Sequence, residues 1–325
     1  MTDLDNFAAR LRAITDGRAS MPRVKDGVMT LALEVGGLTP EKRDAIAAAI
    51  REGALTVPGV TDVRVAMTAE RKSVRIIAVA SGKGGVGKST LSANLAVALT
   101  RLGHRVGLVD ADIYGPSQAR LMASEDQKPQ ARDKQLIPVQ SPLGVPMLSM
   151  AHLVEPGRAL AWRGPMVSNA LGQLIDADWG DVDMLIVDMP PGTGDIQLSM
   201  IQKHKPIGVV IVSTPQDLAL IDAIRAVNLF EQAHVPLIGL IENMAGYACP
   251  HCGEMSDPFG SGGAEAAAEK MDMPFLGRIP LDIEIRRRSD AGSPPAAGDD
   301  VHAGAFRDIA AKVAAYAAGP NPMRA

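Results

Sequence analysis

A glycine-rich loop directly behind an apolar segment is the feature that most limits what this chain can fold into. Residues 74–80 are apolar enough for a buried strand, and they lead into Gly82-Lys83-Gly84-Gly85-Val86-Gly87-Lys88-Ser89-Thr90. Glycines let backbone N–H groups close around a phosphate, and the helix that follows adds the positive end of its dipole. Lys88 would bring positive charge to the β- and γ-phosphates, and the Ser89 hydroxyl would ligate Mg²⁺. The spacing therefore predicts a strand–loop–helix phosphate site, a P-loop.

Strands and helices alternate along the rest of the chain. Apolar strands are expected at 74–80, 105–109, 184–188, 207–213, 237–242 and 274–279. Helices are expected between them, for example over 89–102 and 218–232. This alternation is typical of a mostly parallel sheet covered by helices on both faces, an α/β fold. Ligands bind such sheets at the carboxyl ends of the strands, so the residues after each strand are the functional candidates.

The chain of 325 residues is long enough for one large domain and a small one. Residues 1–68 are expected to form a small α+β unit with helices at 4–15 and 40–53 and strands at 27–35 and 60–67. The P-loop domain is expected over 73–318, followed by a flexible tail at 319–325. Within it, the polar, proline-bearing segment 124–142 is expected to be a surface excursion.

Composition excludes several classes of protein. A net charge of −4 gives no broad attraction to nucleic acid or anionic lipid, and 3% aromatic residues argue against a base-stacking surface. No apolar stretch would span a bilayer, and the N-terminus lacks the apolar core of a signal peptide. Two cysteines cannot build a disulfide scaffold. A cytoplasmic protein with no nucleic-acid or membrane partner is therefore expected.

Carboxylates follow two of the expected strands. Asp110 and Asp112 could hold Mg²⁺ through water and position a hydrolytic water; the alternative is that this segment caps the next helix, with Ser117 as a candidate cap. Asp188 closes another apolar strand and is expected beside Mg²⁺. Gly192 and Gly194 would then let a backbone N–H approach the γ-phosphate.

Two later segments carry further candidates. Asn243 ends a strand and could pair with a purine, although a turn-forming role fits the residue type equally well. Cys249 and Cys252 stand three residues apart, so they can bind one soft metal centre from the same side. Two ligands rarely complete a site, so histidines or a second copy of the chain would have to add the others. The spacing leaves zinc, an iron–sulfur cluster, a redox pair and inert thiols open.

In combination these motifs resemble one family. Lys83, early in the loop, gives the deviant Walker A signature of nitrogenase iron protein, MinD and ParA. With the segments 110–117, 188–195 and 242–245 and the Cys-Pro-His-Cys motif, the chain is similar to the Mrp/ApbC iron–sulfur cluster carriers over about residues 73–318. The resemblance implies a homodimeric ATPase that carries a [4Fe–4S] cluster to apoproteins.

The resemblance also implies roles for individual residues. Residues 82–90 would hold ATP, with Lys88 on the phosphates, Ser89 on Mg²⁺ and Thr90 on the α-phosphate. Lys83 would cross to the partner's nucleotide, and Asp112 would orient the attacking water beside Asp110 and Asp188. Because no arginine finger is evident, turnover is expected to be slow.

The remaining implied roles concern the base and the cluster. Asn243 would face adenine, and the turn from Pro280 to Asp282 would border it. Cys249 and Cys252 of each subunit would share one cluster. Residues 1–68 resemble the small domain that often precedes this ATPase, but they lack its cysteine next to Thr39-Pro40-Glu41-Lys42, so a structural or docking part is expected.

Three alternatives remain at this point. The first is a MinD/ParA-like positioning ATPase with a structural zinc or redox cysteine pair. The second is an ATP-dependent reductase resembling nitrogenase iron protein, although its cluster cysteines are far apart in sequence. The third is an ATPase that zinc merely stabilises.

Overall fold

The computed structural model describes residues 3–36, 38–68, 74–132, 135–153 and 164–319. The chain divides into two compact units, Met1–Ser73 and Val74–Ala325. The segment 69–73 lies outside the described residues. So does the tail expected at 319–325, apart from residue 319.

The small unit packs two helices against a three-stranded sheet. Helices α1 (Asp3–Thr15) and α2 (Pro40–Leu55) accompany strands β1 (Arg23–Lys25), β2 (Val28–Glu34) and β3 (Asp62–Thr68), in the order β1-β2-β3. β2 and β3 are parallel, whereas β1 is antiparallel to β2. β1 was not predicted, because its three residues are all exposed and show no apolar alternation. It pairs through a tight turn in which Asp26 and Gly27 both have positive φ.

The large unit is built on an eight-stranded sheet in the order β15-β12-β11-β4-β10-β5-β9-β8. Its central and outer strands are β4 (Arg75–Ala80), β5 (Val106–Asp110), β10 (Met184–Asp188), β11 (Gly208–Ser213), β12 (Leu237–Asn243) and β15 (Phe275–Ile279). These six strands were predicted, and every pair among them is parallel. The expected α/β class with a mostly parallel sheet is confirmed.

The other edge of this sheet differs from the expectation. The segment 124–142 does carry a hairpin of β6 (Gln130–Arg132) and β7 (Gln135–Ile137), but its end forms β8 (Val139–Gln140) in the main sheet. β8 runs antiparallel to β9 (Pro146–Ser149), which in turn is parallel to β5. β9 was missed because it is short and starts at a proline, which is tolerated only at the first residue of a strand or at an edge.

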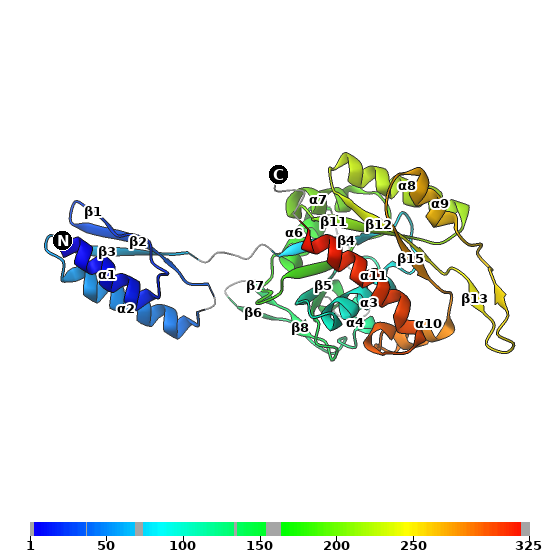
Figure 1. Ribbon diagram of the computed structural model, residues 1–325, viewed down its shortest axis with the longest axis horizontal. Coiled ribbons are helices and arrows are strands. Elements are labelled where there is room, and N and C mark those ends of the chain that lie inside the picture. Colours follow the sequence, from blue (N-terminus) through cyan, green and yellow to red (C-terminus); the bar gives the residue numbers. More distant parts are fainter. Residues whose placement is uncertain (1–2, 37, 69–73, 133–134, 154–163, 320–325) are drawn as a thin grey trace. The chain divides into compact units, whose positions relative to one another are not determined.

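Helices cover both faces of the sheet, so its strands are buried on both sides (Figure 1). On one face α3 (Lys88–Arg101), α10 (Ile283–Asp290) and α11 (Val301–Ala318) pack on side chains such as Ile77 and Val79. On the other face Ile76 and Ala78 contact a core that includes α6 (Gly164–Ile175), α7 (Asp195–His204), α8 (Asp217–Gln232) and α9 (Gly263–Lys270). The short helices α4 (Gln118–Leu121) and α5 (Met150–Leu153) follow β5 and β9.

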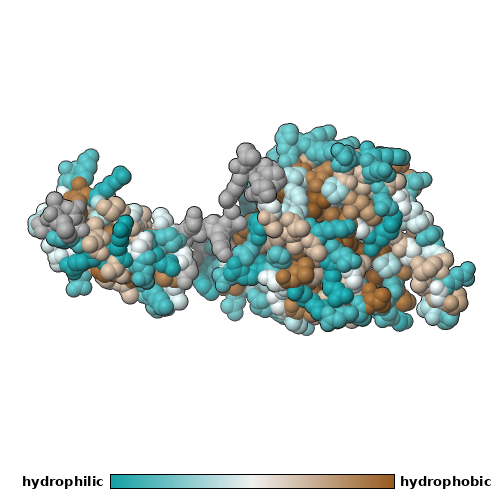
Figure 2. All heavy atoms as spheres, viewed as in Figure 1, coloured by the Kyte–Doolittle hydropathy of each residue, from teal (hydrophilic) through white to brown (hydrophobic). Residues whose placement is uncertain are grey.

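The surface is mixed in polarity. Figure 2 shows hydrophilic residues over most of the visible face, interrupted by apolar patches on the large unit. Within the described part of the chain, no helix combines the length and apolarity needed to cross a membrane.

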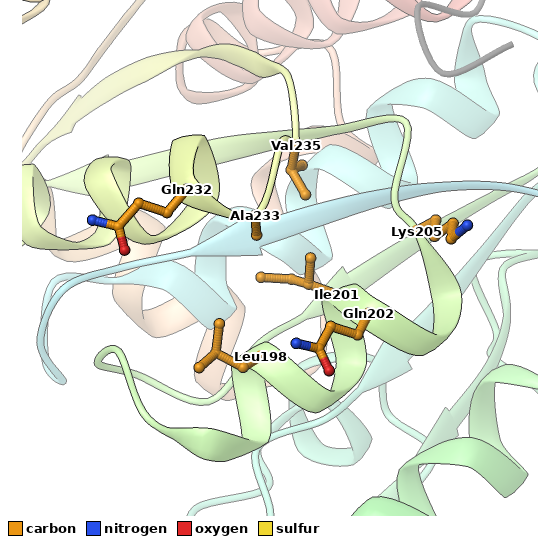
Figure 3. Close-up of a pocket in the computed structure, with 7 residues that line it drawn as sticks. All are labelled: Leu198, Ile201, Gln202, Lys205, Gln232, Ala233 and Val235. Carbon is orange, nitrogen blue, oxygen red and sulfur yellow. The ribbon is translucent and has the colours of Figure 1, made fainter.

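A hollow of about 500 Å³ lies between α7 and α8 (Figure 3). Its apolar floor is flanked by polar side chains, and the lining residues are Leu198, Ile201, Gln202, Lys205, Gln232, Ala233 and Val235. Because Lys205 and Gln232 stand at the carboxyl ends of these helices, the hollow lies away from the P-loop end of the sheet.

Candidate functional site

The P-loop connects β4 to α3 with a backbone that only glycine allows at several points. Gly85 and Gly87 have φ of 81° and 84°. A Cβ on Gly82 would lie 1.9 Å from the carbonyl oxygen of Asp222 in α8, and one on Gly87 would lie 2.1 Å from Nδ2 of Asn243. Residues 82–90 therefore form a closely packed backbone turn at the carboxyl end of β4, with the N-terminus of α3 at Lys88. This is the geometry that a phosphate requires.

Lys88 and Asp188 form a buried ion pair. Lys88 Nζ lies 2.7 Å from Oδ1 of Asp188, and the two side chains are 6% and 0% exposed. Asp188 also accepts hydrogen bonds from Ser92 Oγ and from Gln118 Nε2, each at 2.8 Å. The two predicted residues thus lie together, and the Lys88 ammonium pairs with the Asp188 carboxylate. Ser92 and Gln118 were missed by the sequence analysis, although Ser92 stands four residues after Lys88 and hence on the same face of the helix.

Asp110 lies beside Asp188 on the neighbouring strand, in register with it. Its Oδ2 accepts hydrogen bonds from Ser149 Oγ at 2.8 Å and from the backbone N–H groups of Ser117 and Gln118, both at 3.0 Å. The Asp110 carboxylate thus caps the start of α4, whereas the Ser117 side chain makes no capping hydrogen bond. Capping of the next helix was the alternative to metal binding, and the structure shows it for Asp110.

Burial first, and then the nearby charge of Asp188, raise the pKa of Asp110 to about 7 against the opposing hydrogen bonds. The folded chain therefore holds a proton at this carboxylate that the unfolded chain releases near pH 4. Between about pH 4 and pH 7 the folded state binds more protons than the unfolded state. The free energy of unfolding consequently falls as pH rises through this window, by at most about 1.4 kcal/mol per pH unit.

We expect Asp110→Asn to flatten this pH dependence. An asparagine whose oxygen faces Ser149, Ser117 and Gln118 keeps three of the four hydrogen bonds and cannot ionise. The measurement is urea unfolding from pH 5 to pH 8 in EDTA without nucleotide, with Asp112→Asn as the control for losing one carboxylate. Equal slopes for wild type and Asp110→Asn would contradict the assignment.

Two other predicted residues stand apart from the buried pair. Asp112 is half-buried, and its Oδ1 accepts from the Gly115 N–H at 3.3 Å. Lys83 offers its carbonyl to Ser81 Oγ at 2.9 Å, and its ammonium makes no ion pair within the described segments. Neither side chain hydrogen-bonds to Lys88 or Asp188 in the described structure.

The loop after β10 is tied to the P-loop and to α7. The Gly192 N–H donates to the Ser81 carbonyl at 2.9 Å. Gln197, a buried residue of α7, donates Nε2 to the carbonyls of Pro190, Pro191 and Gly192 at 3.0, 3.1 and 3.3 Å. The glycines of this loop were predicted to matter, but Gln197 was not. The signal that could have found it is its place at the third residue of α7, where a glutamine accepts from the N-cap backbone, as Gln197 does from the Gly194 N–H at 3.0 Å.

The predicted base contacts have other partners in this structure. Asn243 is buried, and its Nδ2 donates to the Val86 carbonyl at 2.8 Å, which fixes the P-loop from the end of β12. Asp282 caps α10 by accepting from the Glu284 N–H at 2.7 Å, and it pairs with His302 at 3.2 Å. Contact of Asn243, Pro280 or Asp282 with adenine stays a prediction.

The two cysteines lie on a hairpin that projects from the large unit (Figure 1). It consists of β13 (Tyr247–Ala248) and β14 (Met255–Ser256), and its turn is closed by a hydrogen bond from the Gly253 N–H to the Cys249 carbonyl at 2.8 Å. Hydrogen bonds from the Cys252 and His251 N–H groups lower the pKa of the Cys249 thiol below its usual value. Both thiols are thus on one turn, and one of them is tuned toward the thiolate that metals bind.

Glu242 anchors the segment that carries this hairpin. Its carboxylate is fully buried and accepts from the N–H groups of Gly262 and Ala264 at 3.0 and 2.7 Å and from Arg278 Nε at 3.1 Å. Arg278 also pairs with Glu265, and its guanidinium lies 5.3 Å from the centroid of the Phe275 ring. The hairpin segment is therefore held at both of its ends, at β12 and at α9.

Known proteins share this architecture. A family model described as ParA: NUBPL iron-transfer P-loop NTPase matches residues 72–314. An iron–sulfur cluster carrier protein of Deinococcus radiodurans is 45% identical over 278 residues, which cover 82% of this chain and 79% of the relative.

Solved structures agree with this match. A nucleotide-binding protein of Archaeoglobus fulgidus in complex with ADP is 39% identical with a TM-score of 0.61, over 70% of this chain and 90% of that one. The septum site-determining protein MinD of Pyrococcus horikoshii, complexed with Mg-ADP, is 25% identical with a TM-score of 0.59, over 75% of this chain and 98% of that one.

These matches confirm the predicted P-loop fold and the resemblance to iron–sulfur cluster carriers. The family model spans both the phosphate loop and the cysteine hairpin. The chain therefore belongs to the NUBPL iron-transfer P-loop NTPase family.

Proposed function

We propose that this protein is an ATP-hydrolysing homodimeric carrier that binds a [4Fe–4S] cluster through Cys249 and Cys252 of each subunit and transfers it to apoproteins. One observation carries the proposal: a single short segment joins the P-loop to the thiols. Asn243, at the end of β12, holds the Val86 carbonyl of the P-loop, and Cys249 follows it six residues later. A change in the P-loop would thus reach the cluster ligands through one hydrogen bond and six residues of chain.

The nucleotide side of the proposal rests on the fit of the residues around the loop. The N–H groups of residues 82–90 would receive the phosphates, and the ammonium of Lys88 would leave Asp188 for them. Ser89, Asp110 and Asp188 would hold Mg²⁺ directly or through water, since it prefers oxygen ligands. Lys83, free of ion pairs in the part of the chain described, would reach the partner's nucleotide, and Asp112 would orient the attacking water.

The cluster side rests on the thiols. A [4Fe–4S] cluster takes four cysteine thiolates. Each chain has two cysteines, and the described residues gather no group of three or more His, Cys, Asp or Glu side chains suited to a metal. Two hairpins, one from each subunit, would complete the set. Such a shared cargo would stabilise the dimer, because ligand binding to the assembled form favours assembly.

Other parts of the proposal follow from this arrangement. The recipients would be apoproteins that lack their cluster, and the carrier would act in the cytoplasm without a membrane or nucleic-acid partner. The unit at 1–68 would serve as a structural or docking part, separate from the P-loop domain at 73–318.

The experiment that tests the function is anaerobic reconstitution with iron and sulfide, followed by transfer to an apo-enzyme. We expect about four iron and four sulfide ions per two chains, a dimeric species by light scattering, and a transfer rate that changes with ATP. Zinc alone after anaerobic purification, or a strictly monomeric protein under every ligand condition, would contradict the proposal.

A further inference from the structure

Gln118 touches all three residues that the proposed function places around Mg²⁺. It is the first residue of α4, and its side chain is fully buried. Its Nε2 donates to Asp188 Oδ2 at 2.8 Å and to the Ser89 carbonyl at 2.9 Å, while its backbone N–H donates to Asp110 Oδ2 at 3.0 Å. No role for this glutamine follows from the sequence pattern.

The orientation of the Gln118 amide is fixed by these contacts. Both partners of its side chain, a carboxylate and a carbonyl oxygen, can only accept hydrogen bonds, so the amide nitrogen must face them. Oε1 must therefore point away from both. This oxygen is buried and receives no hydrogen bond from any described residue. Buried acceptors without a donor are rare in folded proteins, and each one calls for an explanation.

The chemistry around Gln118 indicates what the missing donor is. Mg²⁺ bound by one or two carboxylates and phosphates keeps several of its waters, which are strong donors. A neutral amide can accept from such a water without adding a third negative charge beside Asp110 and Asp188. In this structure the Lys88 ammonium fills the position next to Asp188, and its move to a phosphate would make room for the metal.

We propose that Gln118 is a positioning residue whose Oε1 accepts a hydrogen bond from a water on Mg²⁺ in the nucleotide complex. The inference rests on the proposed nucleotide site, because the metal enters with the nucleotide. The same amide holds Asp188 and the start of α3 through Nε2, so it would couple the metal's hydration shell to the carboxylate that faces it.

The test compares the affinity for a fluorescent ADP analogue in Mg²⁺ with that in EDTA. Gln118→Met keeps the length of the side chain and removes the acceptor Oε1, together with the Nε2 hydrogen bonds to Asp188 and to the Ser89 carbonyl. We expect it to weaken binding in Mg²⁺ about tenfold, the lower range for removal of an outer-shell partner of a metal. Binding in EDTA should stay close to that of wild type, because no metal-bound water is present there.

Ser92→Ala is the matched control. It also removes one hydrogen bond to Asp188 but leaves the Gln118 oxygen in place. We expect any loss of affinity in this variant to be similar in Mg²⁺ and in EDTA. Gln118→Asn is the second variant, for the case that Gln118→Met does not fold. It draws the amide back by one methylene group, and we expect the same Mg²⁺-selective loss of affinity.

Two outcomes separate this inference from the function on which it rests. If wild type binds the analogue more tightly in Mg²⁺ and the Gln118 variants lose affinity equally in both buffers, Gln118 is only structural and the inference fails alone. If wild type itself shows no Mg²⁺-dependent nucleotide binding, the inference and the proposed nucleotide site fail together.

Discussion

Replacing Lys88 by alanine is expected to abolish ATP hydrolysis and, at the same time, to destabilise the nucleotide-free protein. The first effect follows because the variant lacks the Lys88 ammonium that would neutralise the negative charge of the β- and γ-phosphates. The second follows from the buried ion pair: without Lys88, the fully buried Asp188 carboxylate loses its counter-charge. Breaking such a pair from one side costs about 3–5 kcal/mol, and the hydrogen bonds from Ser92 and Gln118 place the expected loss at the lower end.

The two effects are separated by a second substitution. Phosphate release reports hydrolysis, and urea unfolding in EDTA reports the free energy of unfolding. We expect Lys88→Ala/Asp188→Ala to regain much of the stability that Lys88→Ala loses, because no unpaired charge remains, while hydrolysis stays absent. A Lys88→Ala protein as stable as wild type would show that the buried pair does not form in solution. Retained hydrolysis would refute the role of the loop.

Replacing Cys249 and Cys252 together by serine is expected to remove all bound iron and sulfide and to leave nucleotide binding intact. A serine hydroxyl stays protonated near neutral pH and is a far poorer ligand of an iron–sulfur cluster than a thiolate. Both residues lie on the turn of the β13–β14 hairpin, outside the hydrophobic cores, so we expect stability to change by less than about 0.5 kcal/mol. Iron and sulfide analysis after anaerobic reconstitution measures the first effect, and ADP affinity measures the second.

His251 provides the control within the same turn. It is exposed and lies between the two cysteines, so His251→Ala changes the hairpin without removing a thiol. We expect this variant to keep its cluster. Wild-type amounts of iron in the double serine variant would refute the assignment of the site. Loss of ADP binding in that variant would mean that the hairpin also belongs to the nucleotide site.

The sequence predicted best those parts of the fold whose residues are buried on both sides. The six predicted strands of the large sheet were recognisable because fully covered strands such as β10 and β11 are continuous apolar runs. β1 and β9 escaped because neither has such a run. Their pairing is decided by a tight turn at Asp26–Gly27 in one case and by an available edge beside β5 in the other.

The candidate site was predictable where a motif is local and not where it depends on tertiary contacts. The loop at 82–90 and the cysteine pair are contiguous in sequence, and strand ends reveal Asp110 and Asp188. Ser149, which donates to Asp110 across 39 positions, and Gln118, which donates to Asp188 across 70, are brought into the site only by the order of the strands. No periodicity in a single sequence encodes that order.

Gln197 links helix α7 to the Pro190–Gly192 turn, because its Nε2 donates to the carbonyl oxygens of all three residues of that turn. If departure of a phosphate displaced that turn, these hydrogen bonds would carry the displacement into α7. Leu198 and Ile201 of the same helix line the hollow against α8 in Figure 3. The width of that hollow would then depend on whether a phosphate is bound at the Pro190–Gly192 turn.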